Sequence, residues 1–363
     1  MRAPPSIVFH VHLVQDVAIL QPLMKLARSL PGSRCEVLVS AEFAKLDATG
    51  RWATELSRLC AELDVPQTHY ASEYEAYRHL QNKRGLIIAG SESNLPNHAV
   101  THRLFASAPS SFTTVTLQHG FECVGFLHNV AHDASAGLAV RFAADVIVGW
   151  FAPARLSSIT ASERAKLYVA GPPAMIEMRP RTRRSAMTDG FDPDAYEGMV
   201  CENLHSVRFK SATTRSGFLE EFTQFERRVK ALGTRVHLRS HPAGQFTEKN
   251  AIALEACTVR STQPLYQIDL TRFAYAISAP SSILFDFMLA GVPVAVWHDG
   301  DNAIDLRNFA SFARVSTAEN WWRFAVAASA DPGRFVSRQD RFIRGLLIPD
   351  DVHQRYAALL SAA

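Results

Sequence analysis

Short apolar runs alternate with amphipathic stretches along most of the chain, and this alternation predicts an α/β fold. The runs are rich in Val, Ile and Leu, as strands of a parallel sheet covered on both faces should be. In the first half we expect strands at residues 6–12, 35–40, 86–89, 113–117, 145–149 and 167–170, with helices at residues 17–30 and 52–63. Strands this short, separated by helical segments, indicate a parallel sheet with helices on its two faces.

The alternation stops at a polar segment and then resumes. Residues 178–194 carry four arginines and two prolines without apolar periodicity, which is typical of a linker. Beyond it we expect strands at residues 198–203, 236–239, 274–279 and 292–297, and helices at residues 217–232, 282–289, 319–328 and 352–360. The pattern therefore predicts two Rossmann-like domains with a deep cleft between them. Their expected bounds are 1–175 and 198–345, with a linker at 176–197 and a C-terminal helix at 346–363.

The residues that follow each strand are the candidates for a site, because ligands of open α/β sheets bind beyond the carboxyl ends of the strands. Four strand ends carry polar side chains that can bind or react. They are His119 and Glu122 in the first half, and Asn203, His205, Ser206, Arg208, Arg239, His241, Pro280, Ser281, Ser282 and Asp286 in the second half. Each residue alone is a weak signal, and their convergence on four strand ends predicts the site.

The second-half candidates have the chemistry of a phosphate site. Ser281 and Ser282 precede an expected helix, where a serine caps free backbone amides and the first turn attracts anions. Arg239 and His241 flank Ser240 and would point the same way if the strand continued. An arginine fork matches phosphate oxygens, and a neighbouring histidine can donate a bond or a proton. A plainly capped helix, a surface arginine and a core histidine are the alternatives.

The first-half candidate is a histidine at a turn. His119 precedes Gly120, which permits a sharp turn and leaves His119 at the carboxyl edge of the sheet. A structural histidine is the alternative. Further along, His128 and His132 are four residues apart, but the spacing fixes no acidic third ligand, and we expect no metal site.

Composition narrows the function classes. The 363 residues carry a net charge of +3, too weak to indicate nucleic acid as a partner. The five cysteines form no CxxC pair, which favours reduced thiols. The start does not resemble a signal peptide, and no apolar run approaches the roughly 20 residues of a membrane span. We therefore expect a cytosolic protein, with peripheral contact at the inner membrane as an alternative. The arginine-rich run at residues 334–344 fits a solvated helix face, or contact with a membrane surface.

Three motifs together resemble a known group of enzymes. They are His-Gly within residues 117–121, Arg-x-His-Pro at residues 239–242, and a Ser-Ser-x-x-x-Asp helix followed by Gly-Val-Pro-Val within residues 278–297. In this order they resemble the bacterial CDP-glycerol glycerophosphotransferases of teichoic acid synthesis. They resemble equally the Kdo transferases of capsule and O-antigen assembly. The resemblance implies a GT-B fold, a cytidine-nucleotide donor and work at the cytoplasmic face of the membrane.

Two departures favour the Kdo branch of this resemblance. The segment Cys-Glu-Asn-Leu-His-Ser-Val-Arg-Phe replaces the Ala-Pro-Thr-Trp-Arg typical of the glycerophosphotransferases, so that Arg208 is the remaining match. The turn after Trp297 also lacks the tyrosine and Arg-Gly pattern common in that group. We expect a glycosyltransferase with a CMP- or CDP-linked donor, best a CMP-linked ulosonic acid such as Kdo, a glycan or lipid-linked glycan acceptor, and no metal or other cofactor.

The resemblance also implies roles for residues. It makes His119 and His241 the functional histidines and assigns the nucleotide phosphate to the region of Arg239, Ser281, Ser282 and Asp286. If transfer retains the anomeric configuration, a first-domain carboxylate would be the nucleophile, with Asp133, Glu122 and Asp145 as candidates in that order. A glycerol- or ribitol-phosphate transferase, a nucleotide-sugar epimerase and a non-catalytic binding subunit are the alternative functions.

Overall fold

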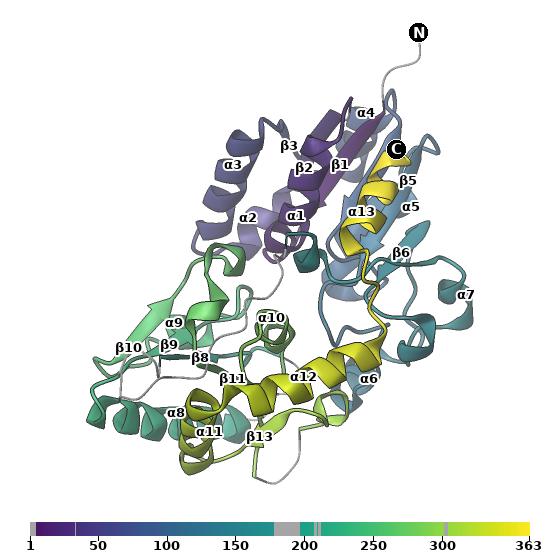
Figure 1. Ribbon diagram of the computed structural model, residues 1–363. Coiled ribbons are helices and arrows are strands. Elements are labelled where there is room, and N and C mark those ends of the chain that lie inside the picture. The colour runs from purple at the N-terminus through teal and green to yellow at the C-terminus, as the bar shows by residue number, and fades with distance from the viewer. Residues whose placement is uncertain (1–4, 33, 178–196, 207–208, 210–211, 301–303) are drawn as a thin grey trace. The chain divides into compact units, whose positions relative to one another are not determined.

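The computed structural model describes residues 5–32, 34–177, 197–206, 209, 212–300 and 304–363, which divide into two compact units (Figure 1). Unit 1 comprises Met1–His128, Ala136–Met178 and Leu346–Ala363. Unit 2 comprises Asn129–Ser135 and Arg179–Gly345. The expected linker at 176–197 lies almost wholly outside the described residues, and the expected domain bounds and cleft stay predictions.

Unit 1 is built on a parallel sheet with the strand order β3-β2-β1-β4-β5-β6-β7 among its described residues. The strands are β1 (Ser6–Val11), β2 (Arg34–Ser40), β3 (Gln67–Tyr70), β4 (Gly85–Ala89), β5 (Phe112–Leu117), β6 (Val146–Gly149) and β7 (Leu167–Val169). Every residue of β1 is buried, as expected for the strand next to the centre of a sheet covered on both faces.

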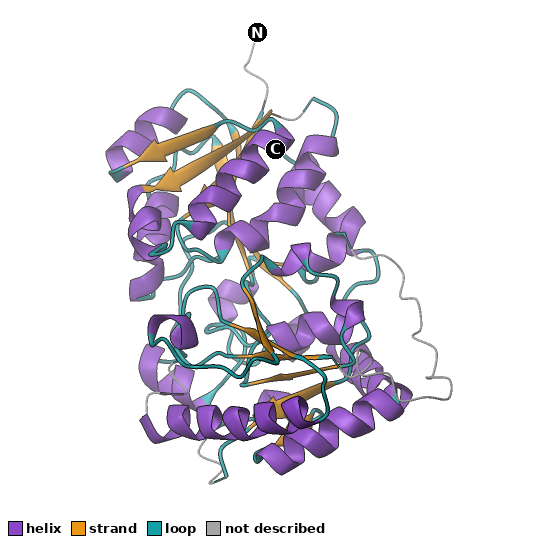
Figure 2. Ribbon diagram, turned by 90° about the vertical axis from the view of Figure 1, so that its left-hand side faces the viewer, coloured by secondary structure: helices purple, strands orange, loops and turns teal. Residues whose placement is uncertain are grey.

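Helices flank this sheet (Figure 2). They are α1 (Asp16–Ser29), α2 (Ala41–Leu46), α3 (Arg51–Leu63), α4 (Glu73–Leu80), α5 (Ala99–Ala106), α7 (Ala161–Arg164) and α13 (Val352–Ser361), with 3-10 turns η1 (Pro96–His98), η2 (Pro153–Arg155) and η3 (Pro173–Ile176). The core between sheet and helices is apolar, and Phe9, Leu20 and Val37 in it are fully buried. The burial of such side chains, at roughly 25 cal/mol per Å² of apolar surface, is the main term that stabilises the unit.

The C-terminal helix α13 packs in unit 1 beside α1 (Figure 1). The Tyr356 hydroxyl donates to the carbonyl of Gly171 at 2.8 Å. Gly171 has a φ of +89°, and a Cβ there would lie 2.7 Å from a methyl of Val352. Glycine is therefore required at this position both by the backbone conformation and by the close approach of α13.

Unit 2 has a second parallel sheet, with the order β10-β9-β8-β11-β12-β13 in the part of the chain that the structure describes. The strands are β8 (Gly198–Cys201), β9 (Val236–Arg239), β10 (Thr258–Ser261), β11 (Tyr275–Ser278), β12 (Val294–Trp297) and β13 (Ala313–Val315). The helices are α8 (Ala212–Ala231), α9 (Phe246–Lys249), α10 (Ile283–Leu289), α11 (Ala318–Ala330) and α12 (Pro332–Leu346), with 3-10 turns η6 (Leu265–Gln267), η7 (Leu270–Arg272) and η8 (Arg307–Phe309). Helix α6 (Val130–Ala136) begins in the segment that belongs to unit 2.

Aromatic rings fill much of the core of unit 2. Phe218 meets Trp297 edge to face at 5.2 Å and Trp321 at 5.4 Å, measured between ring centroids. Phe225 lies 5.6 Å from the Trp321 ring. Such tilted pairs stabilise beyond the area that they bury. They fix α8 and α11 against the sheet.

The predicted α/β class with two parallel sheets is confirmed. Strands β3, β10 and β13 were not expected from the sequence, because β3 and β10 are polar edge strands and β13 is only three residues long. All five cysteines are free thiols, and four of them are buried.

Candidate functional site

Each sheet has one position where the strand order reverses. In unit 1 this topological switch lies between β1 and β4, and in unit 2 it lies between β8 and β11. Ligands of open α/β sheets bind beyond the carboxyl ends of the strands at such a point. The two switch points are therefore the places to compare with the candidates from the sequence.

The switch point of unit 2 brings two predicted segments together. The Asn203 amide donates to the carbonyl of Pro280 at 2.7 Å, which joins the loop after β8 to the loop after β11. Two residues earlier on each segment, the Ser278 hydroxyl donates to the carbonyl of Cys201 at 3.1 Å. Ser206 closes the first loop, since its amide donates to the carbonyl of Asn203 at 3.2 Å. Arg208, the remaining candidate of this loop, lies outside the described residues.

Two predicted histidines stack beside this switch point. The rings of His205 and His241 lie 4.0 Å apart between centroids, with their planes at 36°. Gly244 makes room for the pair, because a Cβ there would lie 2.7 Å from Nδ1 of His205. Burial, together with the nearby cations of Lys249 and Arg215, lowers the pKa of His205 to about 4. His205 is thus a neutral ring at pH 7, held against His241.

Arg215 and Lys249 were missed by the sequence reasoning. Arg215, near the start of α8, lies with its guanidinium carbon 5.7 Å from the centre of the Phe246 ring, and its buried Nε has no hydrogen-bond partner among the described residues. Lys249 ends the short helix α9. Neither residue follows a strand, and only the fold places their charges near His205. Both charges act on His205, and a phosphate site needs positive charge of this kind.

Arg239 is buried below this surface rather than exposed on it. It ends β9 with a 5 % exposed side chain, and its Nη1 donates to the carbonyl of Gln263 at 2.6 Å. Desolvation raises the pKa of Asp286 to about 7, and the Arg239 cation opposes this rise. Because β9 ends at Arg239 and the chain turns at His241, the expected strand alternation between the two does not continue. Arg239 and Asp286 form an electrostatic pair under the switch point.

The serine pair caps its helix differently from the expectation. Helix α10 begins at Ile283, and Ser282 occupies the N-cap position without a side-chain cap bond. Ser281 instead accepts a long hydrogen bond of 3.4 Å from the Ile283 amide. The seven-residue helix has little dipole to offer an anion. Both hydroxyls nevertheless lie in the loop after β11, at the switch point.

In unit 1, the loop that carries His119 is tied down from inside. The buried Gln118 donates through Nε2 to the carbonyl of Gly120 at 3.0 Å and accepts from the Trp150 amide at 2.9 Å. The Cys123 thiol also lies 3.1 Å from the Gly120 carbonyl. These bonds fix the turn, and His119 is left half-buried at the carboxyl end of β5.

Two further histidines lie at the switch point of unit 1. His98, in η1, meets the His119 ring edge to face at 5.8 Å and shares a 2.7 Å hydrogen bond with Ser93. His12 follows β1 and bonds Ser40 at 2.9 Å. Burial lowers the pKa of His98 to about 3 and also lowers that of His12. This edge therefore presents neutral hydrogen-bonding rings, in contrast to the cations of unit 2.

A buried carboxyl supports the same edge. Asp16, at the start of α1, accepts from the amides of His12 at 3.0 Å and Leu13 at 2.7 Å, and from Ser91 at 3.4 Å. Desolvation raises its pKa to about 7. A Cβ at Gly90 would lie 2.6 Å from its Oδ1. The sequence reasoning did not identify Asp16, since it read these residues only as the end of a strand and the start of a helix.

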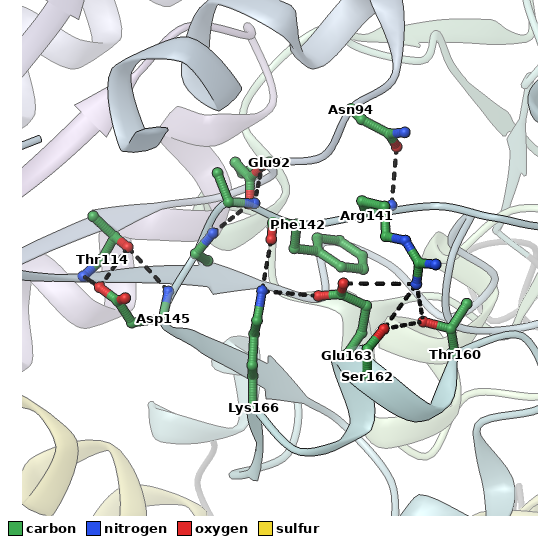
Figure 3. Close-up of polar contacts among 12 residues, drawn as sticks. Glu92, Asn94, Thr114, Arg141, Phe142, Asp145, Thr160, Ser162, Glu163 and Lys166 are labelled. Atoms are coloured by element: carbon green, nitrogen blue, oxygen red, sulfur yellow. Dashed lines mark hydrogen bonds and ion pairs between the residues drawn. The ribbon is translucent and has the colours of Figure 1, made fainter. Parts of the chain in front are cut away.

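The three carboxylates weighed as nucleophiles lie in different places. Glu122 is buried in the loop that carries His119. Asp133 lies on α6, in the segment that belongs to unit 2. Asp145 precedes β6, at the amino end of the sheet, and its Oδ2 accepts from the Thr114 amide and hydroxyl at 2.8 Å each (Figure 3). Asp145 therefore clamps β5 to β6 and is removed from the candidates.

Another buried acid organises the chain that leads into β6. Glu92 accepts from the amides of Ala143 at 3.0 Å and Ala144 at 3.2 Å and pairs with His102 at 2.5 Å. Nearby, Asn94 bonds the amide of Arg141 at 3.0 Å (Figure 3). These contacts satisfy the polar groups of an irregular segment, which is a structural role.

The described residues contain neither a metal-binding cluster nor a membrane-spanning helix. No group of three or more His, Cys, Asp or Glu side chains in them is arranged to hold a metal ion. Across the same described ranges, no helix is both long and apolar enough to cross a membrane.

Comparison with solved structures identifies the fold. The wall teichoic acid polymerase TagF, in a histidine-to-asparagine variant, matches with a TM-score of 0.61 and 11 % identity, over 99 % of this chain and 89 % of that one. A structure provisionally assigned as a UDP-N-acetylglucosamine 2-epimerase of Listeria monocytogenes matches with a TM-score of 0.60 and 12 % identity, over 99 % and 96 %. The calicheamicin glycosyltransferase CalG4 matches with a TM-score of 0.53 and 14 % identity, over 99 % of both chains.

These similarities confirm the predicted GT-B fold of two Rossmann-like domains. At such low identity they show the fold alone. No protein-family model matches the sequence, and no curated protein does.

Proposed function

We propose that this protein is a glycosyltransferase that moves a sugar from a nucleotide-activated donor to a glycan or lipid-linked glycan acceptor. The donor that we favour is a CMP-linked ulosonic acid such as Kdo, because of the sequence resemblance. The observation that carries the proposal is the group of His205, His241, Arg215 and Lys249 beside the switch point of unit 2. Shared GT-B architecture with known glycosyltransferases supports it.

In this proposal unit 2 binds the nucleotide. Arg215 and Lys249 supply the positive charge that the departing phosphate needs, and preorganised charge of this kind is often the largest catalytic term. His241 donates a hydrogen bond or a proton to the phosphate oxygen as the bond between that oxygen and the anomeric carbon breaks. Ser281 and Ser282 bind phosphate or ribose oxygens from the loop after β11. Arg239 acts from below, through its charge and by holding Asp286.

Unit 1, in the same proposal, binds the transferred group and the acceptor. A ring nitrogen of His119 can accept the proton of the attacking hydroxyl, and general base catalysis of this kind contributes typically 10²–10⁴-fold. If transfer retains configuration, Glu122 becomes the first candidate for the nucleophile, since it lies in the same loop as His119. Asp133 is the second candidate. We propose that no metal takes part and that the protein works at the cytoplasmic face of the membrane.

Two other activities use the same fold. A glycerol- or ribitol-phosphate transferase would break the diphosphate of its donor, at the bond from the bridging oxygen to the transferred phosphorus. Similarity to TagF favours this activity. An epimerase would invert one centre of a nucleotide sugar, and similarity to the Listeria structure favours it. An epimerase needs no acceptor, and that difference separates it from both transferases.

The experiment offers CMP-Kdo, CDP-glycerol and UDP-N-acetylglucosamine in separate reactions, each with and without an inner-membrane glycolipid fraction, and follows products by mass spectrometry. The proposal expects CMP release that requires the acceptor, and a loss of about 100-fold in His241→Ala. His69→Ala, on the exposed edge strand β3, is the matched control and should keep full activity. Conversion of a nucleotide sugar without acceptor, or full activity in His241→Ala, contradicts the proposal.

A further inference from the structure

Helix α12 is fixed in its rotation by three inward side chains. Phe335 meets the Phe324 ring of α11 at 5.2 Å, and Phe342 meets the Phe312 ring at 5.2 Å. Between them, the buried Gln339 accepts from the Val294 amide at 2.9 Å and donates to the Val292 carbonyl at 2.8 Å. These three positions are spaced by four and three residues and so lie on one face of α12, which packs against the rest of unit 2.

The opposite part of α12 carries a row of arginines. Arg334, Arg338, Arg341 and Arg344 are all exposed. At about 100° per residue, they span about 120° of the circumference, centred about 120° from the inward face. From first to last they cover about 15 Å of helix length. Figure 1 draws α12 in yellow-green along the outside of unit 2.

This arginine face, defined by Arg334, Arg338, Arg341 and Arg344, is not neutralised by the chain itself. No ion pair joins any of the four guanidinium groups to an acidic side chain in the part of the chain that the structure describes. Asp340, the acid within α12, lies about 100° away from the centre of the face. The whole chain has a net charge of only +3, so four positive charges on one helix are a local concentration.

We propose that the arginine face of α12 docks this protein onto an anionic lipid surface. Because the apolar face of α12 is packed in unit 2, the contact would be electrostatic, and each arginine near an anionic headgroup surface contributes about 1 kcal/mol. Leu347, at the end of the helix, is 55 % exposed and supplies an apolar side chain next to the charges. No exposed aromatic side chain lies between the four arginines on α12 to stack on a nucleic-acid base. This favours lipid over nucleic acid as the partner.

The docking surface is separate from the donor site, and its test does not depend on transfer. The probe is a vesicle of phosphatidylcholine with 30 % phosphatidylglycerol, compared with pure phosphatidylcholine, in sedimentation at about 50 mM salt. The test variant is Arg334→Gln, Arg338→Gln and Arg341→Gln together. The control variant replaces three exposed arginines of unit 1, as Arg34→Gln, Arg78→Gln and Arg155→Gln.

Each arginine near an anionic surface contributes about fivefold in affinity, so the test variant should bind anionic vesicles about 100-fold more weakly than wild type. The control variant should keep most of the binding, and added salt should weaken the wild type. Equal binding by wild type and test variant overturns the proposal, as does absence of binding to anionic vesicles by the wild type. Tighter binding to an oligonucleotide than to vesicles, lost in the test variant, also overturns it. The salt series tests whether the contact is electrostatic, and the single variant Arg338→Gln, which should bind about fivefold more weakly, tests its location where the triple variant folds poorly.

Discussion

Replacement of Arg239 should reveal whether the buried charge under the switch point is structural. In Arg239→Met, the hydrogen bond to the Gln263 carbonyl is lost, and a bond from a charged donor contributes about 2 kcal/mol. The pKa of Asp286, about 7 with Arg239 present, should then rise further. At a pH above the Asp286 pKa of both proteins, each unit of that rise lowers the free energy of unfolding by about 1.4 kcal/mol more. We therefore expect a total cost of about 3 kcal/mol at pH 8.5.

The pH dependence gives this prediction its sign. The folded pKa of Asp286 lies above its unfolded value of 3.8, so this group lowers stability as pH rises from about 4 to 7. Without Arg239 the decline should continue above pH 7, whereas it levels off in the wild type. At pH 6, where Asp286 is mostly protonated in both proteins, the cost should fall to about 2 kcal/mol, the hydrogen bond alone.

Urea unfolding at pH 6 and pH 8.5 measures both numbers, followed by the fluorescence of the buried Trp297 and Trp321. Arg235→Met is the matched control, because its side chain is 65 % exposed and its Glu197 partner lies 4.0 Å away. It should cost less than about 1 kcal/mol at either pH. A cost for Arg239→Met below 1 kcal/mol, or one that is equal at the two pH values, would refute the reasoning.

Three further changes have defined outcomes. Gly244→Ala should displace the His205 side chain, whose Nδ1 and Cβ would lie 2.7 and 2.9 Å from the new Cβ. It should weaken nucleotide binding in calorimetry about tenfold and lower the free energy of unfolding by about 1 kcal/mol. His10 is fully buried and its pKa is lowered to about 3, so acid protonates it in the unfolded chain before it does so in the folded one. The free energy of unfolding should therefore fall by about 2 kcal/mol between pH 7 and 5 on account of this residue. His10→Gln should remove that part of the acid destabilisation, and an unchanged pH profile would count against it. Glu92→Gln should lower the free energy of unfolding by about 2 kcal/mol, because it leaves buried amides with a poorer acceptor, and unaltered amide exchange at residues 143–144 would contradict this.

Much of the fold could be predicted from the sequence, because buried parallel strands are short apolar runs. Residues 113–117, for example, were expected as a strand, and β5 spans Phe112–Leu117. Helix α8 was expected at 217–232 and spans Ala212–Ala231. Strand β10 (Thr258–Ser261) escaped because it is polar and lies at a sheet edge, where periodicity is weak.

The candidate site was predictable only where it follows strands. His119, Asn203, His241 and Ser281 were found by their place after a strand. Arg215 lies on a helix, and its charge reaches His205 only through the packing of the folded unit. His12 and His98 could not be identified from the sequence either, because their roles depend on contacts between distant segments.

The burial of Arg239 is likewise a property of the fold that the sequence does not show. From the sequence, a surface arginine was an equal alternative at this position. The 5 % exposure of the side chain and its bond to Gln263 instead predict a loss of stability. His241→Ala is therefore the cleaner test of chemistry.

The central claim is that the switch point of unit 2 binds the phosphate of a nucleotide through Arg215, Lys249, His205 and His241. Isothermal titration of CMP, CDP, UDP and GDP into the wild type and into Arg215→Gln tests it most directly. The account predicts that a cytidine nucleotide binds and that Arg215→Gln, folded as judged by its melting curve, binds at least about tenfold more weakly. Failure of all four nucleotides to bind, or equal affinity in the variant, would contradict it.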